Sequence, residues 1–166
     1  MLSNLEKALN KEAKNVVTQA RANLTRKDKN VTSELYKSLD YKIDTNNDKA
    51  VIEFLMAEHG EYQDKGVSGI LKKFQTPYSF KPNKFPNMKR IEQWVKARGL
   101  KFRDSKGKFK KGGIKTLTYL IARSIHRKGI KPSLFFTKPY ERLMVKLDDV
   151  ILDALILDIE QGIIKE

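Results

Sequence analysis

Apolar residues recur at steps of three and four along two long stretches, one near each end of the chain. The first stretch starts at Leu2 and predicts an amphipathic helix of about twenty residues that packs against a sheet. Ser3 and Glu6 match a capping box at its start. The apolar positions of this helix are Leu2, Leu5, Leu9, Ala13, Val16, Val17, Ala20 and Leu24.

From Tyr140 onward the same spacing predicts a C-terminal helix. A broad apolar face needs a partner, so we expect this helix to be buried between layers or packed against another subunit. The main stripe consists of Leu143, Leu147, Val150, Ile151, Ala154, Leu155 and Ile159, and it is widened by Leu152 and Ile156.

Between these helices, two short segments alternate apolar and polar residues as half-buried strands do. The segments 39–43 and 50–56 flank a cluster of turn residues at 45–48, which predicts an antiparallel β-hairpin. Residues 32–35 favour one short helical turn before the first strand. The pattern therefore changes from a helical period to a strand period within a few residues.

The middle of the chain is richer in glycine and proline. Gly60, Gly66 and Gly69 predict tight turns around Tyr62. Residues 70–89 predict an irregular loop pinned by prolines, and its aromatic residues are expected to anchor it to the rest of the protein. Those aromatic residues are Phe74, Phe80 and Phe85.

Two further helices follow this loop. Asn87 favours a helix start, Gly99 favours its end, and the helix is expected to place Trp94 in the core. A second helix spans 116–128 and ends before Gly129. Its expected apolar stripe is Leu117, Leu120, Ile121, Ser124 and Ile125.

The C-terminal end of helix 116–128 gathers cations, which suit the negative end of a helix dipole. We expect His126 to belong to this cationic end rather than to a separate site. The segment 130–136 that follows is expected to be extended.

These elements together predict an α+β fold. It has a small antiparallel sheet, a long N-terminal helix, further packed helices and a long basic loop insertion. A chain of 166 residues is long enough to bury a core as one domain. We expect a single domain over 1–166, with the irregular and basic region 70–115 as an insertion.

Charge is concentrated in the middle of the chain. Residues 65–131 carry twenty basic and two acidic side chains, a net charge of +18, while the flanking regions 1–64 and 132–166 carry −1 and −3. The total is +14. Such a surface favours DNA, RNA or an acidic protein as partner.

The segment 98–115 has the highest density of charge, with eight basic residues against Asp104. The turn at 105–107 predicts a basic hairpin or an extended loop with one phenylalanine on each arm. It is either a solvated loop or a contact site for a polyanion or a protein partner. The candidate contact residues are Arg98, Lys101, Phe102, Arg103, Lys106, Lys108, Phe109, Lys110, Lys111 and Lys115.

Most catalytic and cofactor chemistry lacks a signal in this sequence. The chain has no cysteine and two histidines, and 107–113 departs from the P-loop spacing. A site with His59 beside Glu58, Glu61 or Asp64 is the one catalytic alternative. We therefore expect no enzyme, no catalytic residue, no cofactor and no metal site.

The apolar runs are also shorter than the ~20 residues that a membrane helix needs, and the start of the chain does not resemble a secretory signal. We expect a protein that is made and used in a cytoplasm and that does not enter a membrane.

The order of elements and three short motifs resemble the tail-completion or neck proteins of tailed bacteriophages. In that family a small polar residue, then Leu and then Ser-Ile precede the first strand, and an aromatic residue close to an acid and a glycine follows the second. A Lys-Gly-Ile-Lys-Pro type of turn and Phe-Phe, here 128–136, come after a later helix. The matching positions of the first two motifs are Thr32, Leu35, Ser38, Leu39, Tyr62, Asp64 and Gly66.

The likeness covers 1–69 and 116–160, whereas 70–115 is longer and more basic than in simple members of the family. The resemblance implies a non-catalytic subunit of a six- or twelve-fold ring at the head–tail junction of the virion, assembled in the cytoplasm of the bacterial host. Its implied neighbours are portal or connector proteins, tail proteins and the viral double-stranded DNA in the channel.

The alternative is a stand-alone, non-specific nucleic-acid-binding protein that uses 98–115, with Phe102 and Phe109 stacking on bases. A nuclease is disfavoured because the basic half lacks the clustered acids that bind a catalytic metal.

Overall fold

The computed structural model describes residues 3–27, 33–46, 49–103, 107–108 and 113–163. The described part of the chain is α+β, as predicted, with six helices and one two-stranded antiparallel sheet. It divides into two compact units. Unit 1 comprises Met1–Ala57 and Leu134–Glu166, and unit 2 comprises Glu58–Ser133. The expected insertion at 70–115 lies within unit 2.

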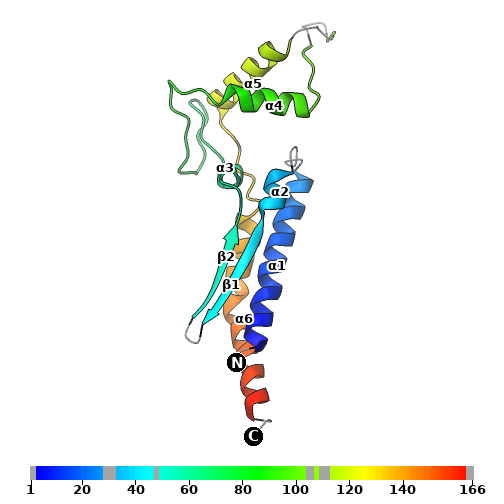
Figure 1. The fold of residues 1–166 in the computed structure, drawn as a ribbon. Helices are drawn as coiled ribbons and strands as arrows, with labels where there is room; N and C mark the ends of the chain where they lie inside the picture. Colours follow the sequence, from blue (N-terminus) through cyan, green and yellow to red (C-terminus); the bar gives the residue numbers. More distant parts are fainter. Residues whose placement is uncertain (1–2, 28–32, 47–48, 104–106, 109–112, 164–166) are drawn as a thin grey trace. The chain divides into compact units, whose positions relative to one another are not determined.

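Unit 1 is built on two long helices that lie side by side, α1 (Ser3–Arg26) and α6 (Thr137–Ile163) (Figure 1). The described positions of the predicted α1 stripe are all buried, which confirms the prediction from periodicity. The last turns of α6 continue past the first residues of α1 (Figure 1). The buried residues of α1 are Leu5, Leu9, Ala13, Val16, Val17, Ala20 and Leu24.

The predicted hairpin is confirmed and lies along these helices. Strand β1 (Asp40–Asn46) pairs antiparallel with β2 (Lys49–Leu55), with Ile43 opposite Ile52. Both isoleucines pack against a core cluster that contains Leu5 and Leu9. Residues 45 and 46 of the expected turn at 45–48 belong to β1, and residues 47–48 lie outside the described chain.

A second cluster closes the other end of unit 1. The short helix α2 (Glu34–Ser38) brings Leu35 into contact with Leu39, Leu24 and the fully buried Phe135. The hydroxyl of Ser38 donates to the carbonyl of Leu35 and accepts the amide of Ala57.

The start of α1 is held by a carboxylate from α6. The amides of Asn4 and Leu5 donate to the two carboxylate oxygens of Asp158 at 3.0 and 3.1 Å. These amides have no partner within their own helix, so an anion is favoured there. The side chain of Ser3, the other half of the expected capping box, is not among the described parts.

Unit 2 contains α3 (His59–Lys65), α4 (Met88–Ala97) and α5 (Ile114–Lys128). The side chain of Asn87 accepts the amide of Arg90, and Gly99 follows α4 with φ +61, so both predicted ends of α4 are confirmed. α4 and α5 pack against each other through Ile91, Val95 and Ala122.

Two of the three glycines between 60 and 69 have a different role from the predicted turns, whereas Gly66 ends α3 with φ +76. Gly60 lies buried within α3, where we expected a turn. A Cβ on Gly69 would lie 2.3 Å from the carbonyl oxygen of Arg127, and one on Gly129 would lie 2.2 Å from that of Val67. These glycines therefore allow two backbone segments to touch, and Val67 and Ile130 exchange hydrogen bonds between them at 2.9 and 2.8 Å.

Three residues that were expected to face the core of unit 2 lie at its surface. Trp94 is 39% exposed, because Ile91 and Val95 occupy the side of α4 that contacts α5; the guanidinium of Arg98 lies 5.8 Å from the Trp94 ring. On α5, Leu120 is 44% exposed and Ser124 is exposed as well, because the buried face is turned toward Thr118, Ala122 and His126.

Candidate interaction surfaces

The basic segment 98–115 connects α4 to α5 (Figure 1). Arg98 follows the last residue of α4, and Lys115 lies in the first turn of α5. Lys101, Arg103, Lys108 and Lys115 are exposed. The other candidate contacts, Lys106, Phe109, Lys110 and Lys111, lie outside the described residues, together with the centre of the predicted hairpin.

Phe102 is half buried, because it packs on the backbone that leads into α5. A Cβ on Gly113 would lie 2.4 Å from the Cβ of Phe102. At this position a glycine is therefore needed for the contact. Phe102 is thus held by its own unit, which leaves less of its ring for stacking with a partner.

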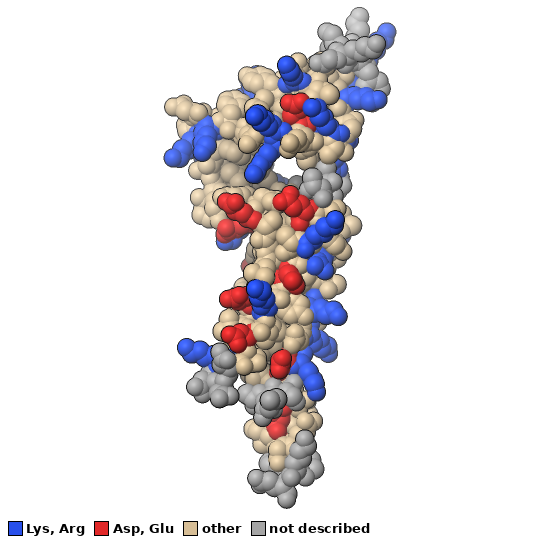
Figure 2. Space-filling model, viewed as in Figure 1, with Lys and Arg blue, Asp and Glu red and all other residues tan. Residues whose placement is uncertain are grey.

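Almost the entire net charge of the protein belongs to unit 2. Its sequence carries twenty basic and five acidic side chains, a net charge of +15, whereas unit 1 carries fourteen basic and fifteen acidic side chains, a net charge of −1. Figure 2 shows mainly Lys and Arg over α4 and α5 and both signs of charge along unit 1. Unit 2 is therefore the strongly basic part of the chain.

His126 is buried in unit 2. The prediction that it joins the exposed cations at the end of α5 is therefore wrong. Its Nε2 lies 2.9 Å from the carbonyl oxygen of Lys81, and its ring stacks on Phe85 with centroids 4.5 Å apart. Phe80 adds a tilted contact at 6.0 Å. Two of the three predicted aromatic anchors of the loop 70–89 thus converge on one histidine.

A hollow of about 620 Å³ opens beside these anchors. We call it the aromatic hollow, because Tyr62, Tyr78, Phe80 and Phe85 contribute its rings. Its size falls in the range of about 300–1,000 Å³ that is typical of ligand sites. Lys81, Lys84 and His59 also line it, and none of the described lining residues is acidic.

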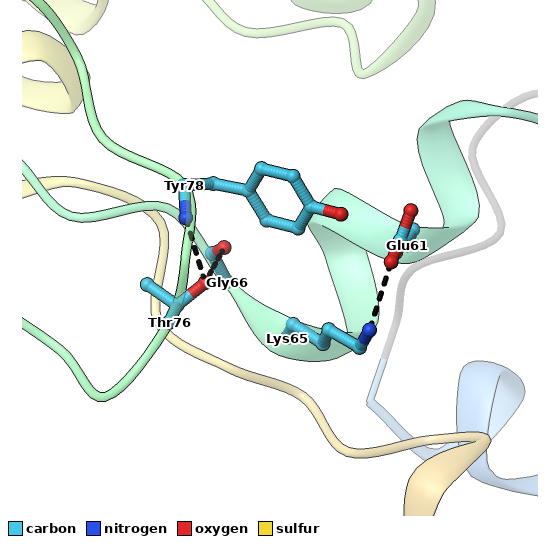
Figure 3. A network of polar contacts seen from close by, with 5 residues as sticks. All are labelled: Glu61, Lys65, Gly66, Thr76 and Tyr78. Carbon is cyan, nitrogen blue, oxygen red and sulfur yellow. Dashed lines mark hydrogen bonds and ion pairs between the residues drawn. The ribbon is translucent and has the colours of Figure 1, made fainter.

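A polar network includes Tyr78, one of the residues that line the aromatic hollow (Figure 3). The ammonium of Lys65 contacts the Glu61 carboxylate at 2.8 Å, and the Thr76 hydroxyl donates to the Gly66 carbonyl at 2.9 Å. The ring of Tyr78 meets that of Tyr62 edge to face at 4.6 Å. The network thus holds α3 and the segment 76–78 together.

The hydrogen bonds of this network shift the pKa values of its titratable side chains. The pKa of Glu61 lies below its ordinary value because of its hydrogen bonds, first to Lys65 and then to the Tyr78 hydroxyl. The same contacts raise the pKa values of Lys65 and Tyr78. Glu61 is therefore engaged by Lys65 and Tyr78.

The second candidate surface lies on α6. The side of α6 that faces α1 buries Leu143 and Ala154, and Leu147 and Ile151 pack against the cluster formed by Leu5, Leu9 and Ala154. A different set of apolar residues, which we call the outer stripe, stays in contact with solvent. It consists of Val145, Leu152, Ile156 and Ile159, which are 87%, 62%, 46% and 61% exposed.

The sequence contained a signal for the outer stripe but not for the aromatic hollow. Leu152 and Ile156 widen the predicted apolar face, and both are exposed, together with Val145 and with Ile159 of the predicted main stripe. The hollow is assembled from four segments between residues 59 and 130, and no local spacing reports such a convergence. Gly66 and Gly69 allow these segments to come together, but the sequence predicts only turns at these positions.

Within the described ranges, there is no group of three His, Asp or Glu side chains able to hold a metal ion. No described helix is long and apolar enough to cross a membrane. No protein-family model matches the chain, and neither a curated protein nor a solved structure does so.

Proposed function

We propose that this protein is a structural subunit of a bacteriophage head–tail connector. In this proposal it forms a neck or tail-completion ring that joins portal or connector proteins to the tail around the DNA channel of the virion. The observation that carries the proposal is the outer stripe of α6. Contiguous apolar residues at the surface of a small protein mark a site of association, and ring assembly supplies one.

The residues on which the phage resemblance rests have structural roles that support it. In unit 1, Leu35 and Leu39 share a core with Phe135, and Ser38 ties α2 to residue 57. In unit 2, Gly66 allows close contact with the backbone at residues 130–132, since an added Cβ would lie 2.6 Å from the carbonyl oxygen of Ile130. The motif residues thus make a core contact in unit 1 and a close backbone contact in unit 2.

The proposal is tested by the mass and shape of the purified protein. We expect closed rings in negative-stain electron microscopy and a matching oligomer mass in solution, alone or with phage connector proteins. Leu152→Asp should dissolve the rings, because it puts a charge in the outer stripe. Ala22→Asp, at an exposed position of α1, is the matched control and should leave them intact. A protein that stays monomeric under all these conditions would overturn the proposal.

The charge of unit 2 favours a second candidate function, non-specific nucleic-acid binding by a stand-alone protein. Each phosphate contact contributes about 0.9 to the slope of log affinity against log salt. Replacing Lys106, Lys108, Lys110 and Lys111 by Ser should therefore lower the slope by up to about 3–4 if all four touch phosphates. An unchanged slope would exclude that contact. Tight DNA binding without any oligomer would favour this candidate over the connector.

A further inference from the structure

We infer that the second half of α6 from one copy of the protein docks into the aromatic hollow of a second copy. The occupant is the segment 147–163, which carries Leu152, Ile156 and Ile159 of the outer stripe, and the receptor is unit 2 of the neighbour. The inference rests on the proposed function in one respect, because this docking would be the contact between subunits that the proposed ring needs.

Charge complementarity selects this occupant. Residues 147–163 carry five carboxylates and no Lys or Arg, whereas unit 2 has a net charge of +15. Asp149, Asp153 and Glu160 flank the outer stripe and are exposed. The rim of the aromatic hollow offers Lys81 and Lys84. Opposite charges at the rim and apolar groups at the centre match the usual anatomy of a protein interface.

The spacing of the outer stripe suits a hollow. Leu152, Ile156 and Ile159 stand at positions i, i+4 and i+7, the anchor spacing of a helix that binds in an apolar groove. They are aliphatic, and the floor that would receive them is made of Tyr62, Tyr78 and Phe85. A cavity of about 620 Å³ has room for several such side chains.

The end of α6 is available to a neighbour. Its last turns continue past the first residues of α1 (Figure 1). Asp158 contacts α1 there, whereas Ile156 and Ile159 on another side of the helix are exposed. Leu157 is 48% exposed there. Two sites with unlike surfaces produce a head-to-tail contact, and repetition of such a contact generates a ring when the rotation closes.

Pairing of two α6 helices is the competing use of the outer stripe. It would bring two copies of an acidic helix segment together, with carboxylates and no cation in 147–163 on either side. Like charges facing each other oppose association. The basic hollow offers the same apolar burial together with favourable charge, so the structure favours the heterologous contact.

The experiment is disulfide mapping in the full chain, which is free of native cysteine. Lys84→Cys marks the rim of the aromatic hollow and Ile159→Cys marks the outer stripe. The two single variants are purified, mixed and oxidised under mild conditions. A disulfide requires the two Cα atoms to come within about 7 Å, so the bond reports a direct contact. Lys128→Cys, beside a different hollow of unit 2, is the matched control.

We expect mixed dimers between Lys84→Cys and Ile159→Cys at least tenfold above those between Lys128→Cys and Ile159→Cys. A charge reversal provides a second measurement. Lys84→Glu should weaken self-association, and adding Asp153→Lys to it should restore part of the loss. A similar yield for both cysteine positions of unit 2 would overturn the inference.

Other outcomes also overturn it. If Ile159→Cys forms dimers only with itself, the α6 helices pair with each other. If a chain with both Lys84→Cys and Ile159→Cys closes an internal disulfide at high dilution, the contact is made within one copy. Rings without the mixed disulfide would refute this contact and leave the connector proposal standing. Mixed disulfides in open chains without rings would refute the connector and leave the contact standing.

Discussion

The contact between α1 and α6 contains one ion pair whose contribution should depend on pH. The carboxylate of Glu12 on α1 is 2.5 Å from the ammonium of Lys146 on α6. The Glu12 side chain is 11% exposed and that of Lys146 is 47% exposed. Replacing Lys146 by Met therefore leaves a nearly buried carboxylate without its cation while keeping the length of the side chain.

The cost follows from the unequal burial of the two partners. Breaking a fully buried pair costs about 3–5 kcal/mol, because the remaining charge stays desolvated. Exposed pairs contribute about 0.2–1 kcal/mol. With Glu12 buried and Lys146 half in solvent, we expect Lys146→Met to destabilise unit 1 by about 1–2 kcal/mol near neutral pH.

The sign of the pH dependence follows from Glu12. Its pKa lies below the ordinary value of 4.5, chiefly because of the hydrogen bond to Lys146. A group with a lowered folded pKa contributes stability above its unfolded pKa and loses it as the pH falls through the folded value. In acid, Glu12 is neutral in the parent and in the variant, so the difference between them should shrink.

The assay is urea unfolding followed by far-ultraviolet circular dichroism at about pH 7 and about pH 3. Glu12→Gln and the double variant complete a cycle that isolates the pair. Lys138→Met, at an exposed position near the start of α6, is the control for a lost lysine. Equal destabilisation by Lys146→Met at both pH values, or no coupling in the cycle, would refute this account of the pair.

Three further predictions concern other contacts. Gly129→Ala should cost more than the about 1–2 kcal/mol of a left-handed backbone, since its Cβ would also strike Val67. Gly99→Ala, with φ +61 and open space around it, should cost only the backbone amount, and equal melting temperatures would contradict the close contact. Phe135→Ala should cost about 3–5 kcal/mol in urea unfolding, and a loss below about 1 kcal/mol would show that the core of unit 1 lies elsewhere. Asp158→Asn should lower the melting temperature near neutral pH, with a smaller effect in acid because the pKa of Asp158 is lowered, first by the Asn4 amide. Asp153→Asn, its exposed control, should change little, and equal effects of the two substitutions would refute the cap.

Periodicity predicted those elements whose buried face is determined by residues that are close together in the sequence. α1 buries a continuous stripe, and the hairpin alternates around Ile43, Ile52 and Phe54, so each is visible in a short window. The fold class and the ends of α4 followed from such local signals. Their success has a physical basis, because helix caps and strand alternation depend on residues within a few positions of each other.

The errors came from residues whose environment is set by distant segments. Trp94 is exposed because Ile91 and Val95 already fill the contact with α5. His126 is buried because a loop some forty residues earlier supplies Phe80 and Phe85. Gly69 has the same sequence signal whether it makes a turn or admits another backbone. No local pattern separates these alternatives.

Two of the candidate surfaces can be recognised from the sequence, and the third cannot. The basic segment 98–115 is visible in composition alone, and the outer stripe is visible in the width of an apolar face. The aromatic hollow requires α3, the loop 70–89 and residue 130 to meet, so it can be recognised only in the folded structure.

The charge of unit 2 has a consequence for any assembly of this chain. Docking of 147–163 brings five carboxylates to a unit of net charge +15, so at most a third of that charge is offset locally. Self-association also cannot change the total, and every copy in a ring still brings +14. Copies of like charge repel each other, and the repulsion grows with each subunit added. In the proposed connector, DNA in the channel or an acidic neighbouring ring would supply the missing anions. The aromatic hollow and the basic segment then have separate roles, the first in holding copies together and the second in meeting the polyanion.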